Sequence, residues 1–267
     1  MALDARTIDV EQSTYFNLLA EMGHTKHIGG QAATVRLAEI ITAGPGDEVL
    51  DVGCGVGIGA VYLAEQFGCR VVGVDITPRM IVRARERAER QGLDEWVDFR
   101  VADMHALPFA DGHFAAAIAE SVLTFSADKT HVVNELMRVV KPGGMVAFTE
   151  VIWVKPPPEG KADFMARAGG MPHGIFSHEE WREIVTASDL DQIIAESYHV
   201  TAREESKNQY NRISPGDYLR TLGNFFKAIT RPQYRQVFRS AMSSMPKDYF
   251  KHIGYGIYGG RKLRTEN

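Results

Sequence analysis

The stretch from Val49 to Ala64, VLDVGCGVGIGAVYLA, constrains the fold more than any other part of this chain. Its short apolar run predicts a buried strand, glycines follow at 53, 55, 57 and 59, and a helical pattern begins at Ala60. A glycine turn between a strand and a helix lets a ligand approach the main chain, and the N-terminus of the helix offers N–H groups to an anion. The stretch therefore predicts an α/β fold with a ligand at the turn.

The glycine turn by itself fits two classes of ligand. Gly55, Gly57 and Ala60 match the relaxed dinucleotide pattern G-x-G-x-x-A, which is typical of nicotinamide or flavin cofactors. Asp51, at the end of the strand, favours another ligand because a carboxylate there can meet a cationic group. Asp75 ends the next apolar run and is placed to accept hydrogen bonds from ribose hydroxyls, which suits both classes.

Five motifs, in order, resemble those of class I S-adenosylmethionine-dependent methyltransferases of the small-molecule type 11 kind. They are DVGCGVG at 51–57, VVGVDITPRMI at 71–81, ADMHALPF at 102–109, FAAAIAESVL at 114–123 and LMRVVKPGGMVAFTE at 136–150. The resemblance runs from about Val49 to Trp153 and resumes at the C-terminus. It implies S-adenosylmethionine as the cofactor and methyl transfer to a small-molecule acceptor, through an N, O, C or S atom that the sequence leaves undetermined.

The resemblance also implies the architecture. We expect a Rossmann-like, doubly wound, mostly parallel seven-stranded sheet with an antiparallel last strand, plus helical N-terminal and C-terminal cap insertions. The chain is then a single methyltransferase domain over 1–267. Its expected parts are an N-terminal helical lid (1–44), the cofactor-binding core (45–153), a linker, helix and strand (154–203), an aromatic-rich helical cap insertion (204–246), and the closing strand and tail (247–267).

Each cofactor-binding residue is assigned by its place in the motifs. Gly53 and Gly55 of the turn bind the cofactor, and Asp75 is placed to bind the ribose. The resemblance implies that Asp103 binds the adenine amino group and that Ile76 and Met104 flank the ring. The loop that begins at His27 resembles the family's contact with the methionine part, although a helix-capping turn fits equally well. Tyr15 offers an aromatic face to the sulfonium, unless it is a core residue. The full set is Tyr15, His27, Ile28, Gly29, Asp51, Gly53, Gly55, Asp75, Ile76, Asp103, Met104 and Glu120.

The catalytic residues cannot be found from a motif, because methyl transfer depends largely on orientation and the exclusion of water. His24 and His173 are candidate bases, each weighed against an ordinary solvated or hydrogen-bonded histidine. In phosphoethanolamine methyltransferases a histidine follows the fourth strand, whereas Thr124 occupies that place here. Arsenite is an unsuitable substrate because Cys54 and Cys69 do not form a thiolate set.

Local signals predict several element boundaries. Thr77 followed by Pro78 indicates a helix start, with a hydroxyl N-cap and proline at the first helical position. Ser177 with Glu180 three residues later predicts a capping box. The KPGG stretch, Lys141–Gly144, predicts a stop and turn between a helix and a strand. The arginines after Pro78 alternate with glutamates and are interpreted as a solvated helix face: Arg79, Arg83, Arg85, Arg87 and Arg90.

Composition bounds the remaining possibilities. The 267 residues carry a net charge of −4, so no overall basic field attracts nucleic acid. Two cysteines fit a reducing cytoplasm, and no signal-peptide core or membrane span is visible. We therefore expect a cytoplasmic enzyme, a monomer or homodimer, without nucleic-acid, membrane or metal partners. A non-catalytic S-adenosylmethionine-binding module and a nicotinamide-dependent oxidoreductase are the alternatives.

Overall fold

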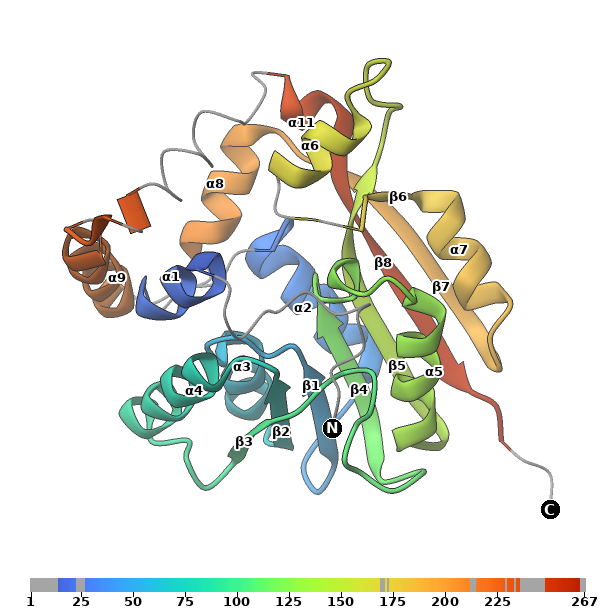
Figure 1. Ribbon diagram of the computed structural model, residues 1–267. Helices are drawn as coiled ribbons and strands as arrows, with labels where there is room; N and C mark the ends of the chain where they lie inside the picture. Colours follow the sequence, from blue (N-terminus) through green and yellow to red (C-terminus); the bar gives the residue numbers. More distant parts are fainter. Residues whose placement is uncertain are drawn as a thin grey trace.

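The computed structural model describes residues 14–22, 27–168, 171, 173–211, 215–228, 230–232, 234–235 and 248–264. Within these residues a central sheet runs through the molecule and helices cover both of its faces (Figure 1). The strands are β1 (Glu48–Val52), β2 (Arg70–Asp75), β3 (Val97–Val101), β4 (Phe114–Glu120), β5 (Val140–Trp153), β6 (Phe176–Ser177), β7 (Leu190–His199) and β8 (Ile253–Lys262).

The described helices follow the strands in the alternation typical of α/β folds. They are α1 (Thr14–Met22), α2 (Gly30–Ile41), α3 (Ile58–Phe67), α4 (Pro78–Gln91), the short 3₁₀ helix η1 (Leu123–Phe125), α5 (Lys129–Val139), α6 (Ala162–Ala168), α7 (His178–Thr186), α8 (Ala202–Asn211), α9 (Pro215–Ala228) and α11 (Tyr249–His252). The predicted lid region thus contains α1 and α2. The predicted insertion contains α9 and most of α8, which begins at Ala202, before the predicted start at 204.

The sheet order is β3-β2-β1-β4-β5-β8-β7, and the short β6 also pairs with β5. The first five strands are parallel, whereas β8 lies antiparallel between β5 and β7. This confirms the mostly parallel sheet with an antiparallel last strand, and the two-residue β6 is an addition to the seven predicted strands. The order reverses direction between β1 and β4, and ligands of open α/β sheets bind at the carboxyl ends of strands beside such a point.

Apolar side chains on both faces of the sheet build two cores. On one face, Leu37 of α2 and Leu63 of α3 pack with Val49 of β1. On the other face, Leu136 of α5 and Trp181 of α7 pack with Leu50 and other strand residues. Successive residues of a strand point to opposite faces, so the continuous apolar run of β1 supplies both cores.

The structure corrects three local expectations. Arg87 does not lie on a solvated face, because it is 4% exposed and its Nε donates to the carbonyl of Val56 in the glycine turn at 3.0 Å. Thr77 occupies the N-cap of α4, but its hydroxyl interacts with Asp75 and makes no capping hydrogen bond. The KPGG stretch lies inside β5, where an irregularity near Gly143 (φ 82°) replaces the predicted turn. The predicted capping box at the start of α7 is confirmed.

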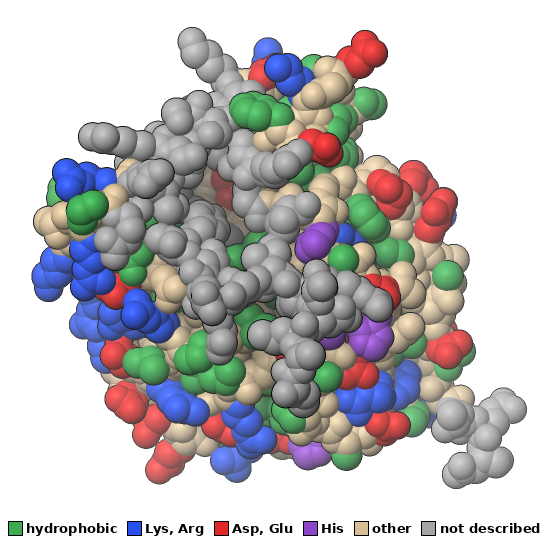
Figure 2. Space-filling model, in the orientation of Figure 1, with side chains coloured by type: hydrophobic (Ala, Val, Ile, Leu, Met, Phe, Trp, Pro, Cys, Tyr) green, Lys and Arg blue, Asp and Glu red, His purple; other side chains and the backbone are tan. Residues whose placement is uncertain are grey.

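The other arginines of α4 fit the solvated face. Arg79, Arg85 and Arg90 are exposed, and Arg83 is half-buried. Figure 2 shows Lys and Arg side chains along the flank of the molecule where Figure 1 places α4 and α9. In the part of the chain that the structure describes, no helix is both long and apolar enough to cross a membrane.

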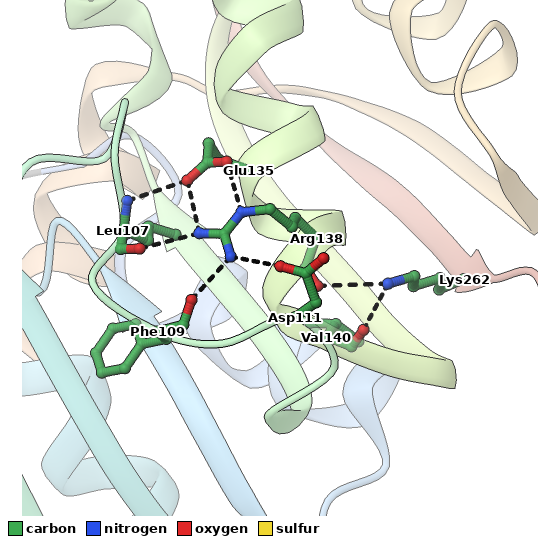
Figure 3. Close-up of polar contacts among 7 residues, drawn as sticks. All are labelled: Leu107, Phe109, Asp111, Glu135, Arg138, Val140 and Lys262. Carbon is green, nitrogen blue, oxygen red and sulfur yellow. Dashed lines mark hydrogen bonds and ion pairs between the residues drawn. The ribbon is translucent and has the colours of Figure 1, made fainter.

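Arg138, on α5, fixes the loop that follows β3 (Figure 3). Its guanidinium donates to the carbonyls of Leu107 at 2.9 Å and Phe109 at 2.8 Å, and pairs with Asp111 at 2.8 Å. Glu135 accepts from Arg138 Nε at 2.7 Å and also from the backbone N–H of Leu107 at 3.0 Å. One planar cation therefore satisfies two loop carbonyls and two carboxylates, which suits the forked geometry of arginine.

Candidate functional site

The glycine turn has three positions whose backbone conformation favours glycine over any residue with a side chain. Gly53, Gly55 and Gly57 all have positive φ angles, of 72°, 54° and 77°. The N–H groups of Gly53 and Cys54 donate to the carbonyl of Val74 at 2.7 and 3.0 Å, which ties the turn to β2. A Cβ on Gly53 would overlap the side chain of Val122, which follows β4. The turn is therefore a close-packed cradle beside the carboxyl ends of three strands.

Asp75 lies at the end of β2, next to the turn. Its carboxylate accepts the backbone N–H of Gly55 at 3.0 Å and that of Thr77 at 2.8 Å. Burial raises the pKa of Asp75, and the two N–H groups oppose that effect. A carboxylate oxygen accepts more than one hydrogen bond, so the group keeps the capacity to accept from neighbouring hydroxyls.

Two carboxylates meet above the start of α3. A Cβ on Gly59 would overlap Glu120 Oε1 and lie 3.4 Å from Asp51 Oδ2, so both side chains approach the same glycine. Asp51 is 2% exposed, and the side chain of Glu120 is 6% exposed. Like charges this close and this buried repel unless a positive group joins them. The arrangement therefore suits a cationic group of a ligand.

The loop before α2 covers Glu120. His27 Nε2 lies 2.9 Å from Glu120 Oε2, and Thr34 Oγ1 donates to the same oxygen at 2.6 Å. His27 is 5% exposed, so the histidine is a buried partner of Glu120 and not a solvated residue at a helix cap. The structure thus brings His27 and Glu120 together, and the loop of residues 27–30 with Thr34 is called the lid below. Thr34 was missed because nothing in the helical pattern of 31–41 marks one threonine as facing a strand end.

Helix α8 closes over this lid. Glu205 accepts the backbone N–H of Gly29 at 2.9 Å, and Gln209 donates to the carbonyl of His27 and to Glu205. A Cβ on Gly30 would lie 2.7 Å from the backbone of Asn208, so the paired glycines permit this approach. The half-buried Ile28 packs against the apolar cluster above the end of β5. These contacts join residues 176 positions apart, which sequence patterns do not reveal.

Asp103 follows β3 and is joined to His105. Its Oδ1 accepts the backbone N–H of His105 at 2.9 Å and lies 2.7 Å from the His105 Nδ1. His105 Nε2 lies 2.8 Å from Ser126 Oγ. The hydrogen bond with His105 lowers the pKa of Asp103, so its carboxylate is held in the ionised form. The two predicted ring-flanking residues, Ile76 and Met104, are half-buried.

The loop after β4 meets the candidate base His173. Thr124 Oγ1 donates to the carbonyl of Gly174 at 3.5 Å, a long contact that brings the 173–175 loop against η1. His173 Nε2 is buried and has no hydrogen-bond partner among the described residues. Burial, with Lys129 and His105 nearby, lowers the pKa of His173 and favours the neutral imidazole. The other candidate, His24, lies outside the described residues, as does the side chain of Tyr15.

Comparison with known proteins shows which protein family this site resembles. Residues 50–148 match the family model described as a methyltransferase domain. These residues therefore carry a class I methyltransferase domain of type 11. This S-adenosylmethionine-dependent family accounts for the motifs after the glycine turn, which the nicotinamide alternative does not explain.

Two curated relatives of this domain are methyltransferases by their names. The chain is 36% identical over 123 residues to the methyltransferase GfsG of Streptomyces halstedii, covering 46% of this chain and 44% of that protein. It is 31% identical over 165 residues to the 27-O-demethylrifamycin SV methyltransferase of Amycolatopsis mediterranei, covering 61% of each chain. The chain thus matches less than two thirds of the length of both relatives.

Solved structures share the fold at low sequence identity. The [4+2]-cyclase SpnF superposes with a TM-score of 0.73 at 23% identity, covering 93% of both chains. An S-adenosylmethionine-dependent methyltransferase from Geobacter sulfurreducens, in complex with S-adenosylhomocysteine, superposes with a TM-score of 0.70 at 19% identity. That match covers 93% of this chain and 98% of the other. These likenesses confirm the Rossmann-like methyltransferase fold.

Proposed function

We propose that this protein transfers the methyl group of S-adenosylmethionine to a small-molecule acceptor. The observation that carries the proposal is the convergence of Asp51, Asp75 and Glu120 on one glycine turn, at the carboxyl ends of three neighbouring strands. The family match over residues 50–148 and the names of the relatives support the same reaction class.

The donor set fits the cofactor part by part. Asp51 and Glu120 suit the α-ammonium of the methionine part, because both carboxylates approach the same glycine. Asp75 suits the ribose diol, and Asp103 suits the adenine amino group, because both of its hydrogen bonds from His105 end on Oδ1. The cradle at Gly53 and Gly55 keeps the main chain close to the ligand. When bound, the cofactor supplies an electrophilic methyl group on a sulfonium.

The chain's own residues orient the reactants and exclude water. The lid formed by His27, Thr34 and α8 covers the carboxylates, so a bound donor is held away from solvent. His173, neutral and with a buried Nε2 beside η1, is the residue we assign as proton acceptor when the nucleophile is a hydroxyl or an amine.

We propose that the acceptor molecule has a large apolar part. An apolar cluster stands above the end of β5, and Ile28 of the lid loop packs against it. Its buried members are Val151, Met165, Ala166, Met171, Ile175, Tyr249 and Ile253. Methionine-rich walls adapt to ligands of irregular shape, which suits a small molecule with a substantial hydrocarbon part.

Calorimetric titration of the full chain with S-adenosylhomocysteine, with NADH as the comparison ligand, tests the proposal. We expect micromolar or tighter binding of S-adenosylhomocysteine only, which is roughly −8 kcal/mol or better. Asp75→Ala should weaken that binding at least tenfold, whereas Asp98→Ala, an exposed aspartate on β3, should leave it unchanged. NADH binding without S-adenosylhomocysteine binding contradicts the proposal, and tight binding without methyl transfer in an acceptor screen favours the non-catalytic module.

The domain division and the cytoplasmic location stay predictions. Limited proteolysis with and without S-adenosylhomocysteine tests whether residues 1–44 and 204–246 cover the core of residues 45–153. If they do, the bound ligand should slow cleavage within these two segments. Subcellular fractionation tests the location.

A further inference from the structure

A carboxyl group that the proposed reaction does not use lies behind the loop after β4. Glu150, on β5, is 0% exposed. Its Oε1 accepts the backbone N–H of Leu123 at 2.7 Å, whereas its Oε2 is buried and has no hydrogen-bond partner among the residues that the structure describes. Burying a carboxylate with an unpaired oxygen is strongly unfavourable, so this carboxyl group needs either a functional role or a bound proton.

A buried lysine holds the other end of the same loop. Lys129, the first residue of α5, is 4% exposed. Its Nζ donates to the carbonyl of Ser126 at 3.0 Å and lies 4.4 Å from the centre of the Phe176 ring. Lysine is almost never this buried without a partner. Glu150 and Lys129 therefore fix the two ends of η1 from inside the core, one through an N–H and the other through a carbonyl.

The loop between them touches the cofactor cradle directly. Ser121 has a φ angle of 52°, which is uncommon for a residue with a side chain, and its N–H donates to the carbonyl of Thr149 at 2.8 Å. The next residue, Val122, packs so closely on Gly53 that a Cβ there would overlap it. A displacement at Leu123 is thus transmitted through one residue to the first glycine of the turn.

We propose that Glu150 is a positioning residue for the cofactor: its protonated carboxyl holds the loop of residues 121–124 against Gly53, and its ionisation releases that loop. The inference rests on the proposed function, because it concerns the affinity of the same cofactor site. Loss of the proton spreads one negative charge over both carboxylate oxygens, including the buried Oε2 that has no hydrogen-bond partner among the described residues. That oxygen then attracts water or the ammonium of Lys129, and either event removes a contact that orders η1.

The surroundings of Glu150 agree with this assignment. Burial raises its pKa to about 8, against the opposing effects of the Leu123 N–H, the charge of Lys129 and the N–H groups of Thr124 and Val122. Burial likewise lowers the pKa of Lys129, although Glu150 and Glu180 of α7 act in the opposite direction. From β8, Tyr258 faces the same group; burial and then the charge of Glu150 raise its pKa, which keeps the phenol neutral. Glu150 therefore titrates within the range where the protein can be assayed.

The test is a pH series of S-adenosylhomocysteine affinity for the full wild-type chain and for Glu150→Gln. Glutamine keeps an acceptor for the Leu123 N–H and cannot ionise, so it imitates the protonated acid. We expect the wild-type affinity to fall about tenfold more than that of Glu150→Gln between pH 7 and pH 9, because the protonated fraction falls by that factor. The ligand's own ammonium titrates in the same range, and it cancels when the two proteins are compared.

Matched measurements keep the outcomes separate. Glu196→Gln, at a strand carboxylate that pairs with Arg36, should follow the wild-type pH series. Hydrogen exchange of residues 119–126 in the wild type should lose protection above pH 8, after correction for the intrinsic rate, and this measurement needs no folded variant. Equal pH series for wild type and Glu150→Gln, or unchanged protection, overturns the role of Glu150 and leaves the proposed function intact. If no protein binds S-adenosylhomocysteine at any pH, the proposed function fails and the inference fails with it.

Discussion

Arg138 provides a sharp test of how the structure holds the loop after β3, which begins beside Asp103. Replacing it by alanine removes the guanidinium hydrogen bonds to the carbonyls of Leu107 and Phe109, of which Leu107 still accepts the backbone N–H of Phe109, and removes two carboxylate pairs. Hydrogen bonds to a charged group contribute about 1.5–3 kcal/mol each, and about 30% exposure of the Arg138 side chain reduces this range. For two carbonyls, we expect Arg138→Ala to lower the free energy of unfolding by about 3 kcal/mol. Arg138→Lys should recover about a third, since one ammonium cannot reach all of these acceptors.

Urea unfolding measures this loss, with Arg182→Ala as the matched control. Arg182 also pairs with a glutamate three residues earlier in a helix, at 2.8 Å, but its side chain is 54% exposed and that of Glu179 is 64% exposed. Such a surface pair contributes about 0.5 kcal/mol or less. If the two alanine variants lose the same stability at equal m-values, the burial and the carbonyl contacts of Arg138 contribute nothing and the reasoning is refuted.

Three further predictions concern the turn, the lid and the buried acid. Gly53→Ala should abolish measurable S-adenosylhomocysteine binding and lower the free energy of unfolding by about 2–4 kcal/mol, because the new Cβ overlaps Val122 at a positive φ. Calorimetry measures the binding, and urea unfolding measures the stability. Glu205→Ala should weaken S-adenosylhomocysteine binding about tenfold by freeing the Gly29 N–H. Glu183→Ala, at an exposed glutamate on α7, is the control that must not weaken it. From pH 4.5 to about 8, native Glu150 keeps a proton that the unfolded chain has lost. The free energy of unfolding of the wild type should therefore fall with rising pH relative to that of Glu150→Gln. The same pH dependence of both proteins in urea unfolding would contradict this.

The parts of the fold that sequence patterns predict are those encoded by neighbouring residues. The glycine turn, the start of α4 at Pro78 and the capping box at Ser177 depend on contacts within a few positions, and all three are in place. The mostly parallel sheet with its antiparallel last strand was predicted from the resemblance of five consecutive motifs to the family. Asp51, Asp75 and Glu120 meet because parallel strands present their carboxyl ends at one edge of the sheet.

The residues that sequence reasoning misplaced or missed depend on distant partners. A helical charge pattern assigned Arg87 to solvent, yet the carbonyl of Val56 in the glycine turn gives the guanidinium a buried partner. Glu205 contacts Gly29, which lies 176 positions earlier in the chain. Glu150 is the last residue of a recognised motif, but the motif does not indicate that its side chain is buried. Whether a charged residue is buried depends on what the rest of the chain places opposite it, and periodicity carries no information on that point.

The placement of β8 between β5 and β7 also has a consequence for biosynthesis. The strand comes after β7 in the chain but lies inside the sheet. Until residues 253–262 have left the ribosome, β5 and β7 each present an unpaired edge, and unpaired edges recruit strands from other chains. Ribosomes that stall or terminate before this segment should therefore release aggregation-prone chains, even though the complete cofactor-binding core has already been made.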